Sequence, residues 1–196
     1  MCIDTFSYLL GKKKGGGGAD LSNYFTSTIS NGASSSIGGY VNMIKKIPDD
    51  TTVSGTSLNY AFSNFLGTEV PLLDTSNVTS MTSMFNDCIN LTTIPLLDMS
   101  SCTSATNMFS GCTNLANVPL LNTSNLSRMN MFSNCPKLTD ASLDNILKMC
   151  INSNVTTATR KKLSDVGLTS TNYPTSRIEA LPSYQDFIDA GWTIGY

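Results

Sequence analysis

The amino-acid sequence predicts an α/β solenoid, a stack of short similar coils closed by a helical cap. A motif recurs every 23 or 24 residues, and each copy joins a stripe of apolar residues at helical spacing to a short strand-like segment. Short polar residues fill the intervals: 30 of the 70 residues from 71 to 140 are Ser, Thr or Asn, and only 6 are charged. This composition suits a chain that turns several times in every coil.

The repeat has two landmarks, a Pro-Leu-Leu motif and a Met-Phe pair. They begin at Pro71, Pro95 and Pro119 and at Met84, Met108 and Met131. The last interval is one residue short, because a residue is missing between Met129 and Met131. A degenerate copy with Tyr-Ala-Phe at residues 60–62 precedes the first motif. We therefore expect repeats over residues 58–140.

Each unit is expected to contain one short helix and one short strand. The helical stripe of the clearest copy consists of Val78, Met81, Met84, Phe85 and Cys88, and its strand contributes Leu91, Ile94 and Leu96 to the core. One unit cannot bury its own stripe, so neighbouring coils must stack and their strands pair in parallel about 4.8 Å apart. The phenylalanines Phe85, Phe109 and Phe132 should then form a column.

Residues 73–95 read L-D-T-S-N-V-T-S-M-T-S-M-F-N-D-C-I-N-L-T-T-I-P. This pattern resembles the BspA-like class of bacterial leucine-rich repeats, especially the variant N-V-T-x-M-x-x-M-F-x-x-C-x-x-L. The resemblance covers about residues 58–140 and implies a leucine-rich-repeat array that binds partners and has no enzymatic activity. Such repeats occur on bacterial surface proteins and in bacteriophage-encoded proteins, as adhesive or host-recognition modules. The last copy departs from the pattern by its missing residue and by Arg128.

The flanking sequences predict four segments. Residues 1–18 form an N-terminal docking segment and flexible linker, 19–57 an N-terminal cap, 58–140 the repeats and 141–196 a helical C-terminal cap. In the docking segment, Phe6, Tyr8, Leu9 and Leu10 precede three lysines and four glycines, which would tether them to a larger assembly. A frayed terminus is the alternative interpretation. The glycine run lacks the register of a phosphate-binding loop.

Three helices are expected in the C-terminal cap. The first begins near residues 139–142 and has an apolar face made by Leu143, Ile146, Leu147 and Cys150. The second spans about 156–166 and stops at Gly167. The third opens with a capping box at 183–186 and closes at Gly191, with Trp192 adding apolar area.

Composition excludes several function classes. The chain has no histidine, which rules out a Ser-His-Asp triad, a Cys-His pair and an imidazole metal site. Three of its six cysteines, Cys88, Cys112 and Cys135, recur in register with the repeat, and no pair shows C-x-x-C spacing, so we expect reduced, buried thiols, no metal and no cofactor. A net charge of −2 gives no reason to expect nucleic acid. No apolar run approaches the roughly 20 residues of a membrane span, so no membrane insertion is expected.

The predicted ligand-binding residues are the outward-facing side chains of the parallel strands. They are Glu69, Thr92, Thr93, Ala116 and Asn117. A shallow row of small polar groups suits a protein surface or a cell-surface glycan. Asp74 and Asp98 could suggest calcium loops, but Asn122 breaks their series and turn capping is the preferred interpretation.

These observations predict a non-enzymatic structural or recognition protein. Because no secretory signal pattern is evident at the first residues, an adhesin-type repeat is best reconciled with a bacteriophage virion, as a tail or capsid-decorating component made in the host cytoplasm. Its N-terminus would then contact other virion proteins. The alternative is a bacterial protein-binding scaffold or surface adhesin of the same repeat type, cytoplasmic or at the cell surface without a classical signal peptide.

Overall fold

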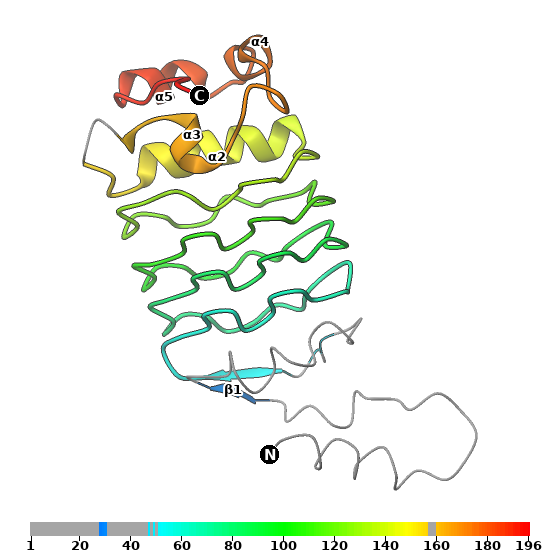
Figure 1. Ribbon diagram of the computed structural model, residues 1–196. Helices are drawn as coiled ribbons and strands as arrows, with labels where there is room; N and C mark the ends of the chain where they lie inside the picture. The colour runs from blue at the N-terminus through cyan, green and yellow to red at the C-terminus, as the bar shows by residue number, and fades with distance from the viewer. Residues whose placement is uncertain (1–27, 31–46, 48, 50, 157–159) are drawn as a thin grey trace, which may run out of the picture.

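The computed structural model describes residues 28–30, 47, 49, 51–156 and 160–196. In this part of the chain, a stack of coils lies between a pair of strands and a group of helices (Figure 1). The strands β1 (Thr28–Ser30) and β2 (Thr52–Ser54) pair in parallel, with Ile29 opposite Val53. Both belong to the expected N-terminal cap. The remainder of that cap up to residue 46 and the docking residues Phe6, Tyr8, Leu9 and Leu10 lie outside the described residues.

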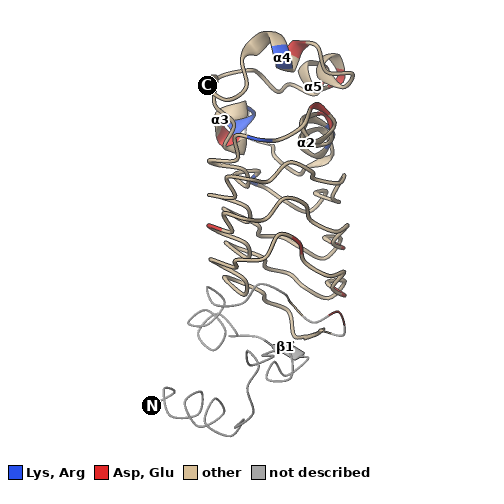
Figure 2. Ribbon diagram, turned by 90° about the vertical axis from the view of Figure 1, so that its right-hand side faces the viewer, with Lys and Arg blue, Asp and Glu red and all other residues tan. Residues whose placement is uncertain are grey.

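Successive coils lie directly on one another along both long sides of the stack (Figure 2). On one side, parallel bridges join Ser57 to Ser80 and Ser80 to Ser104. On the other side, a parallel bridge joins Thr93 to Asn117. The intervals between these partners are 23 and 24 residues, so the period of the sequence is also the period of the stack.

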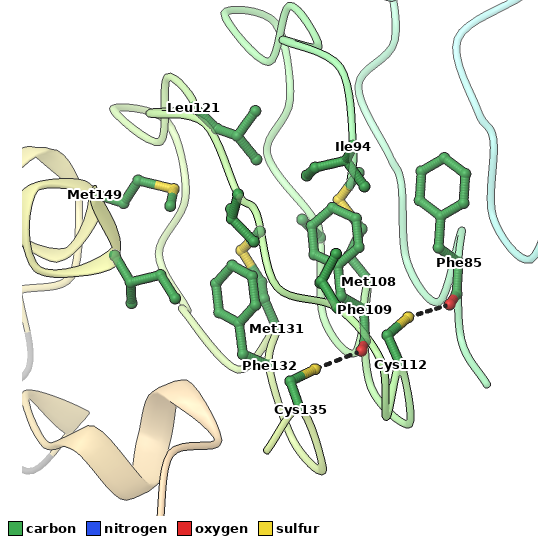
Figure 3. Close-up of a cluster of buried hydrophobic side chains, with 14 of the residues drawn as sticks. Phe85, Ile94, Met108, Phe109, Cys112, Leu121, Met131, Phe132, Cys135 and Met149 are labelled. Atoms are coloured by element: carbon green, nitrogen blue, oxygen red, sulfur yellow. Dashed lines mark hydrogen bonds between the residues drawn. The ribbon is translucent and has the colours of Figure 1, made fainter. Parts of the chain in front are cut away.

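The phenylalanine column expected from the repeat is present in the core (Figure 3). The ring of Phe85 lies 5.4 Å from that of Phe62 and 5.7 Å from that of Phe109, and Phe132 continues the column at 5.5 Å. Adjacent rings are within 16° of parallel. Each coil thus covers the apolar surface of the next, as a single repeat cannot do for itself.

The prediction of a short helix in each repeat is wrong for the described coils, because residues 58–139 contain no helix. The apolar stripe is built from successive tight turns instead. Along residues 83–88, backbone amides that bond inside the coil alternate with amides that bond to the next coil. The Met84 amide donates to the Met81 carbonyl of its own coil (3.2 Å), and the Phe85 amide donates to the Met108 carbonyl of the next coil (2.9 Å). The stripe is therefore hydrogen-bonded to the neighbouring coil, whereas the backbone hydrogen bonds of an α-helix lie within the helix.

Left-handed residues make these turns possible. Ser83 and Asp87 have φ of 53° and 57°, and their counterparts one coil later are Asn107 and Gly111, with φ of 57° and 80°. Such values interrupt a helix and are best tolerated by Gly, Asn and Asp. The apolar residues between them keep the spacing of three and four that predicts a helix from sequence.

The prediction that Leu96 lies in the core is also wrong. Leu96 is 61% exposed, whereas Leu97 is buried. Because this segment is extended, adjacent side chains point to opposite sides and two consecutive leucines cannot both face the core. The same division recurs in the other Pro-Leu-Leu motifs, at Leu72 and Leu73 and at Leu120 and Leu121.

The repeat cysteines are buried free thiols, and each bonds to the preceding coil. Cys88 donates to the Phe62 carbonyl at 3.1 Å. Cys112 donates to the Phe85 carbonyl and Cys135 to the Phe109 carbonyl, at 3.1 and 3.0 Å (Figure 3). Burial raises the pKa of the Cys135 and Cys150 thiols, so both are protonated at neutral pH. Cys88, Cys112 and Cys135 are hydrogen-bond donors between coils, a role beyond the small apolar one expected of them.

The C-terminal cap lies on the last coil and comprises α2 (Asp140–Asn152), α3 (Leu163–Val166), α4 (Thr175–Glu179) and α5 (Tyr184–Asp189). The first expected helix is confirmed, with Thr139 as its N-cap and with Leu143, Ile146, Leu147 and Cys150 buried. The second is shorter than expected but ends at left-handed Gly167, as expected. The capping box at Ser183 is wrong, because its side chain makes no capping hydrogen bond and its amide donates to Asp144 Oδ1.

Candidate functional site

The strand segments of three coils form one continuous side of the stack, which we call the extended face: residues 68–73, 92–97 and 116–121. Its backbone is paired between coils. The Thr92 amide donates to the Thr68 carbonyl at 2.9 Å, and the Ala116 amide donates to the Thr92 carbonyl at 3.0 Å. The column ends where Thr139, the N-cap of α2, donates to the Ala116 carbonyl. The face therefore has a fixed backbone on which side chains stand in columns.

The predicted ligand-binding residues fall into two adjacent columns. The first, which we call the polar row, contains Glu69, Thr93 and Asn117, of which Glu69 and Asn117 are exposed and Thr93 is half-buried. The second contains Thr92 and Ala116. The Thr92 hydroxyl donates to the Thr68 carbonyl at 3.0 Å. The Thr92 hydroxyl is thus engaged between coils. The side chains of the polar row are the predicted binding groups that remain available to a partner.

A column of exposed leucines runs beside the polar row. We call Leu72, Leu96 and Leu120 the leucine row; they are 69%, 61% and 43% exposed. Single exposed leucines are ordinary on protein surfaces, but three equivalent ones stand in register here, about 4.8 Å from one coil to the next. Each follows a proline, whose ring fixes the backbone φ immediately before the leucine and so stiffens the segment that carries the row.

The repeat region has an acidic surface. Between residues 51 and 127 the chain has four carboxylates and no lysine or arginine; the four are Glu69, Asp74, Asp87 and Asp98. Hydrogen bonds from Ser76 to Asp74 and from Ser100 to Asp98 lower the pKa of both carboxyls, which keeps them charged at neutral pH. A partner of this surface is therefore favoured when it carries basic residues.

The aspartates that could have suggested calcium loops cap turns instead. Asp74 Oδ1 accepts from the Ser76 amide at 3.1 Å, Asp98 Oδ1 from the Ser100 amide at 2.8 Å, and Asn122 does the same for Ser124 at 3.1 Å. An asparagine performs this role as well as an aspartate does. Among the described residues no group of three or more His, Cys, Asp or Glu side chains is arranged to hold a metal ion.

Sequence reasoning missed the leucine row, although the signal was present. The Pro-Leu-Leu motif appears three times, and an extended segment must turn one leucine of each pair outward. It noted Arg128 only as a departure from the repeat and did not connect it to the distant Arg160 and Asp165, which line the same cavity.

The geometry describes a protein of stacked sequence repeats that presents one flat face with a polar and an apolar column. The chain belongs to the family described as "Mycoplasma protein of unknown function, DUF285", whose model matches residues 41–163. No curated protein and no solved structure matches the chain. In the part of the chain that the structure describes, no helix is both long and apolar enough to cross a membrane.

Proposed function

We propose that this chain is a non-enzymatic recognition protein, a BspA-like leucine-rich-repeat solenoid whose extended face binds a protein surface. The leucine row carries the proposal. Burying a leucine side chain contributes about 1.5–3 kcal/mol when it leaves water completely, and three prepositioned leucines provide a strong apolar contact for a partner. A row of polar groups alone would suit a glycan, but the adjacent leucines favour a protein.

The partner's chemistry follows from the same face. It should present apolar side chains opposite Leu72, Leu96 and Leu120 and a basic residue opposite Glu69. Charge complementarity of this kind accelerates association and weakens as salt is added. Binding should therefore slow with increasing ionic strength, while the apolar contact persists.

Site-directed variants test the binding face directly. The test variant combines Leu72→Ser, Leu96→Ser and Leu120→Ser, and a second combines Thr93→Lys with Asn117→Lys. The matched control replaces exposed apolar residues elsewhere, Tyr60→Ser and Ile89→Ser. In pull-downs from the producing cells, a partner should bind wild type and control protein and be lost from both test variants, with thermal unfolding of the test variants unchanged. A partner retained by all variants would refute this face as the binding site.

The biological setting we propose is a bacteriophage virion, in which the protein is made in the host cytoplasm and displayed on the tail or capsid. The resemblance to repeats that occur in phage-encoded recognition modules supports this setting. A second candidate is a bacterial protein-binding scaffold or surface adhesin, which the family's description as Mycoplasma proteins favours. Density-gradient purification separates the two. The intact chain should co-purify with particles in the first case, and should be found in uninfected cells in the second.

A further inference from the structure

The last coil differs from the others by one missing turn. In complete coils two left-handed residues stand four apart, as at Ser83 and Asp87 or at Asn107 and Gly111, whereas the last coil retains only Asn134. The Asn107 amide donates to the Asn130 carbonyl at 2.6 Å, which places Asn130 where Thr106 stands one coil earlier. The deleted position is therefore the first left-handed residue itself.

Helix α3 occupies the place of the missing turn. The amides of Met131 and Phe132 both donate to the Val166 carbonyl, at 3.2 and 3.1 Å. In earlier coils the equivalent methionine amide bonds inside its own coil and the phenylalanine amide bonds to the next coil. Gly167 lies so close that a Cβ atom there would stand 2.5 Å from the Ser133 nitrogen. This contact brings the side chains of α3 beside Arg128, at the position held by Ser80 and Ser104 in earlier copies.

A cavity of about 280 Å³ lies at this junction. It is lined by Arg128, Met129, Asn130, Arg160, Ser164 and Asp165. The amide group of Asn130 is already engaged at both ends, with Asn107 at 3.2 Å and with Ser133 at 3.1 Å, and gives the cavity a fixed wall. Its volume lies at the lower limit of ligand sites, which run from roughly 300 Å³ upward, and this suits a single small ring.

The cavity contains unused hydrogen-bonding capacity of both kinds. Asp165 Oδ2 is buried without a hydrogen-bond partner among the described residues. Its carboxylate is not within ion-pair distance of either arginine in the described part of the chain. A carboxylate without hydrogen-bond partners is costly to bury, so a donor that reaches its accessible side is favoured. The two guanidiniums offer several donors in the planar arrangement that matches a carboxylate.

We propose that this cavity binds an acidic sugar, a hydroxylated ring that carries one carboxylate. The ligand's carboxylate pairs with Arg128 and Arg160, and a ring hydroxyl donates to the Asp165 carboxylate, which lines the cavity. A simple inorganic anion would satisfy the arginines but has no ring hydroxyl to place beside Asp165, and a neutral sugar would leave the arginines unpaired. The combination of both groups in one cavity selects a ligand with both features. This site shares no residue with the extended face.

Calorimetric titration of the full chain tests the proposal with glucuronate, glucose and inorganic phosphate. We expect glucuronate to bind at least tenfold more tightly than glucose or phosphate. Arg128→Ser should weaken glucuronate binding at least tenfold, and the fold should persist because the other copies carry serine there. Lys137→Ser removes one exposed charge from the same coil and serves as the matched control, with unchanged affinity. Arg160→Ser provides a second, exposed test position.

Asp165→Asn distinguishes a sugar site from a plain anion site. It should weaken glucuronate binding, because the hydroxyl loses its acceptor, without the same loss for phosphate. The proposal is overturned if phosphate binds wild type as tightly as glucuronate and more tightly still after this substitution, or if glucuronate does not bind. Methyl glucuronide then separates two sources of the ligand: equal affinity indicates a terminal residue of a glycan, and lost affinity indicates the free sugar acid.

Discussion

Removing adjacent rings from the phenylalanine column measures how strongly neighbouring coils are coupled. Phe85 and Phe109 are fully buried, with ring centroids 5.7 Å apart and planes within 3°. Replacing either by leucine removes three buried carbon atoms, and at about 0.8 kcal/mol for each buried methylene this predicts a loss of about 2 kcal/mol. Urea denaturation of Phe85→Leu and Phe109→Leu provides the free energies of unfolding.

The double variant is the informative measurement. Stacked aromatic pairs contribute about 0.5–1.5 kcal/mol beyond the area they bury, and the first substitution already removes this contribution. The Phe85→Leu/Phe109→Leu protein should therefore lose about 1 kcal/mol less than the two single variants together. If the double variant instead loses as much as the two single variants together, direct ring stacking is refuted as a source of stability.

Phe62 and Phe132 provide the matched control, because they are the outer members of the same column and stack on different rings. Their substitutions should be additive to within about 0.3–0.5 kcal/mol. Coupling as large as that of the adjacent pair would indicate that the stack responds as a whole, and the pairwise explanation would then be wrong.

Two further predictions concern the turns and the cap. Asp87→Gly should be more stable than Asp87→Ala by about 1 kcal/mol, since alanine is strained at φ of 57° and only part of this is offset in the unfolded chain; equal stabilities would contradict the role of the left-handed turn. Tyr173→Phe should lose about 2–4 kcal/mol in urea titrations, because the Tyr173 hydroxyl donates to the Cys135 carbonyl and accepts from the Leu138 amide, and both groups would lose their partner. Burial raises the pKa of Tyr173 to about 12 from 10, so the native state holds this proton more tightly than the unfolded chain. This contribution to the free energy of unfolding is present below pH 10 and is lost as pH rises from 10 to 12. The free energy of unfolding of Tyr173→Phe should therefore depend less on pH in this range than that of wild type.

The sequence predicted the period and the columns because both depend on identity at a fixed interval. Phe85, Phe109 and Phe132 recur at the repeat interval. Because one repeat is too small to bury its own apolar residues, the neighbouring repeat must cover them. The same argument predicted the first cap helix, where Leu143 and Ile146 follow a single helical face over several turns.

The turns of the repeat could not be separated from a helix by apolar spacing alone. Turns that end on a left-handed residue every four positions place Met81, Met84 and Phe85 inward, as a helix would. The distinguishing signal lies in the polar residues between them. Asn107 and Gly111 are residue types that accept positive φ, and their recurrence at a spacing of four indicates chain reversals.

The cysteines show a second limit of sequence reasoning. Their register correctly indicated burial in one structural column, because a copied position has a copied environment. Their hydrogen bonds to the phenylalanine carbonyls, which also accept an amide of their own coil, depend on how the turns orient each carbonyl. That depends on the alternation of amides within and between coils, which becomes evident only when the turns are known.

A site built from irregular positions is the hardest to predict, and the cavity at Arg128 shows why. In a regular coil the backbone groups follow one repeated pattern of bonds within the coil and to its neighbour, and the side chains repeat what the preceding coil presents. Such a surface offers rows of like side chains, from which a site with several different groups is hard to build. The deleted residue removes that constraint at one coil and lets α3, more than thirty residues further along the chain, contribute Asp165 beside Arg128. The interruption of the repeat therefore creates the chemical diversity that the regular coils lack, and a ligand that depends on it should be lost when the missing turn is restored.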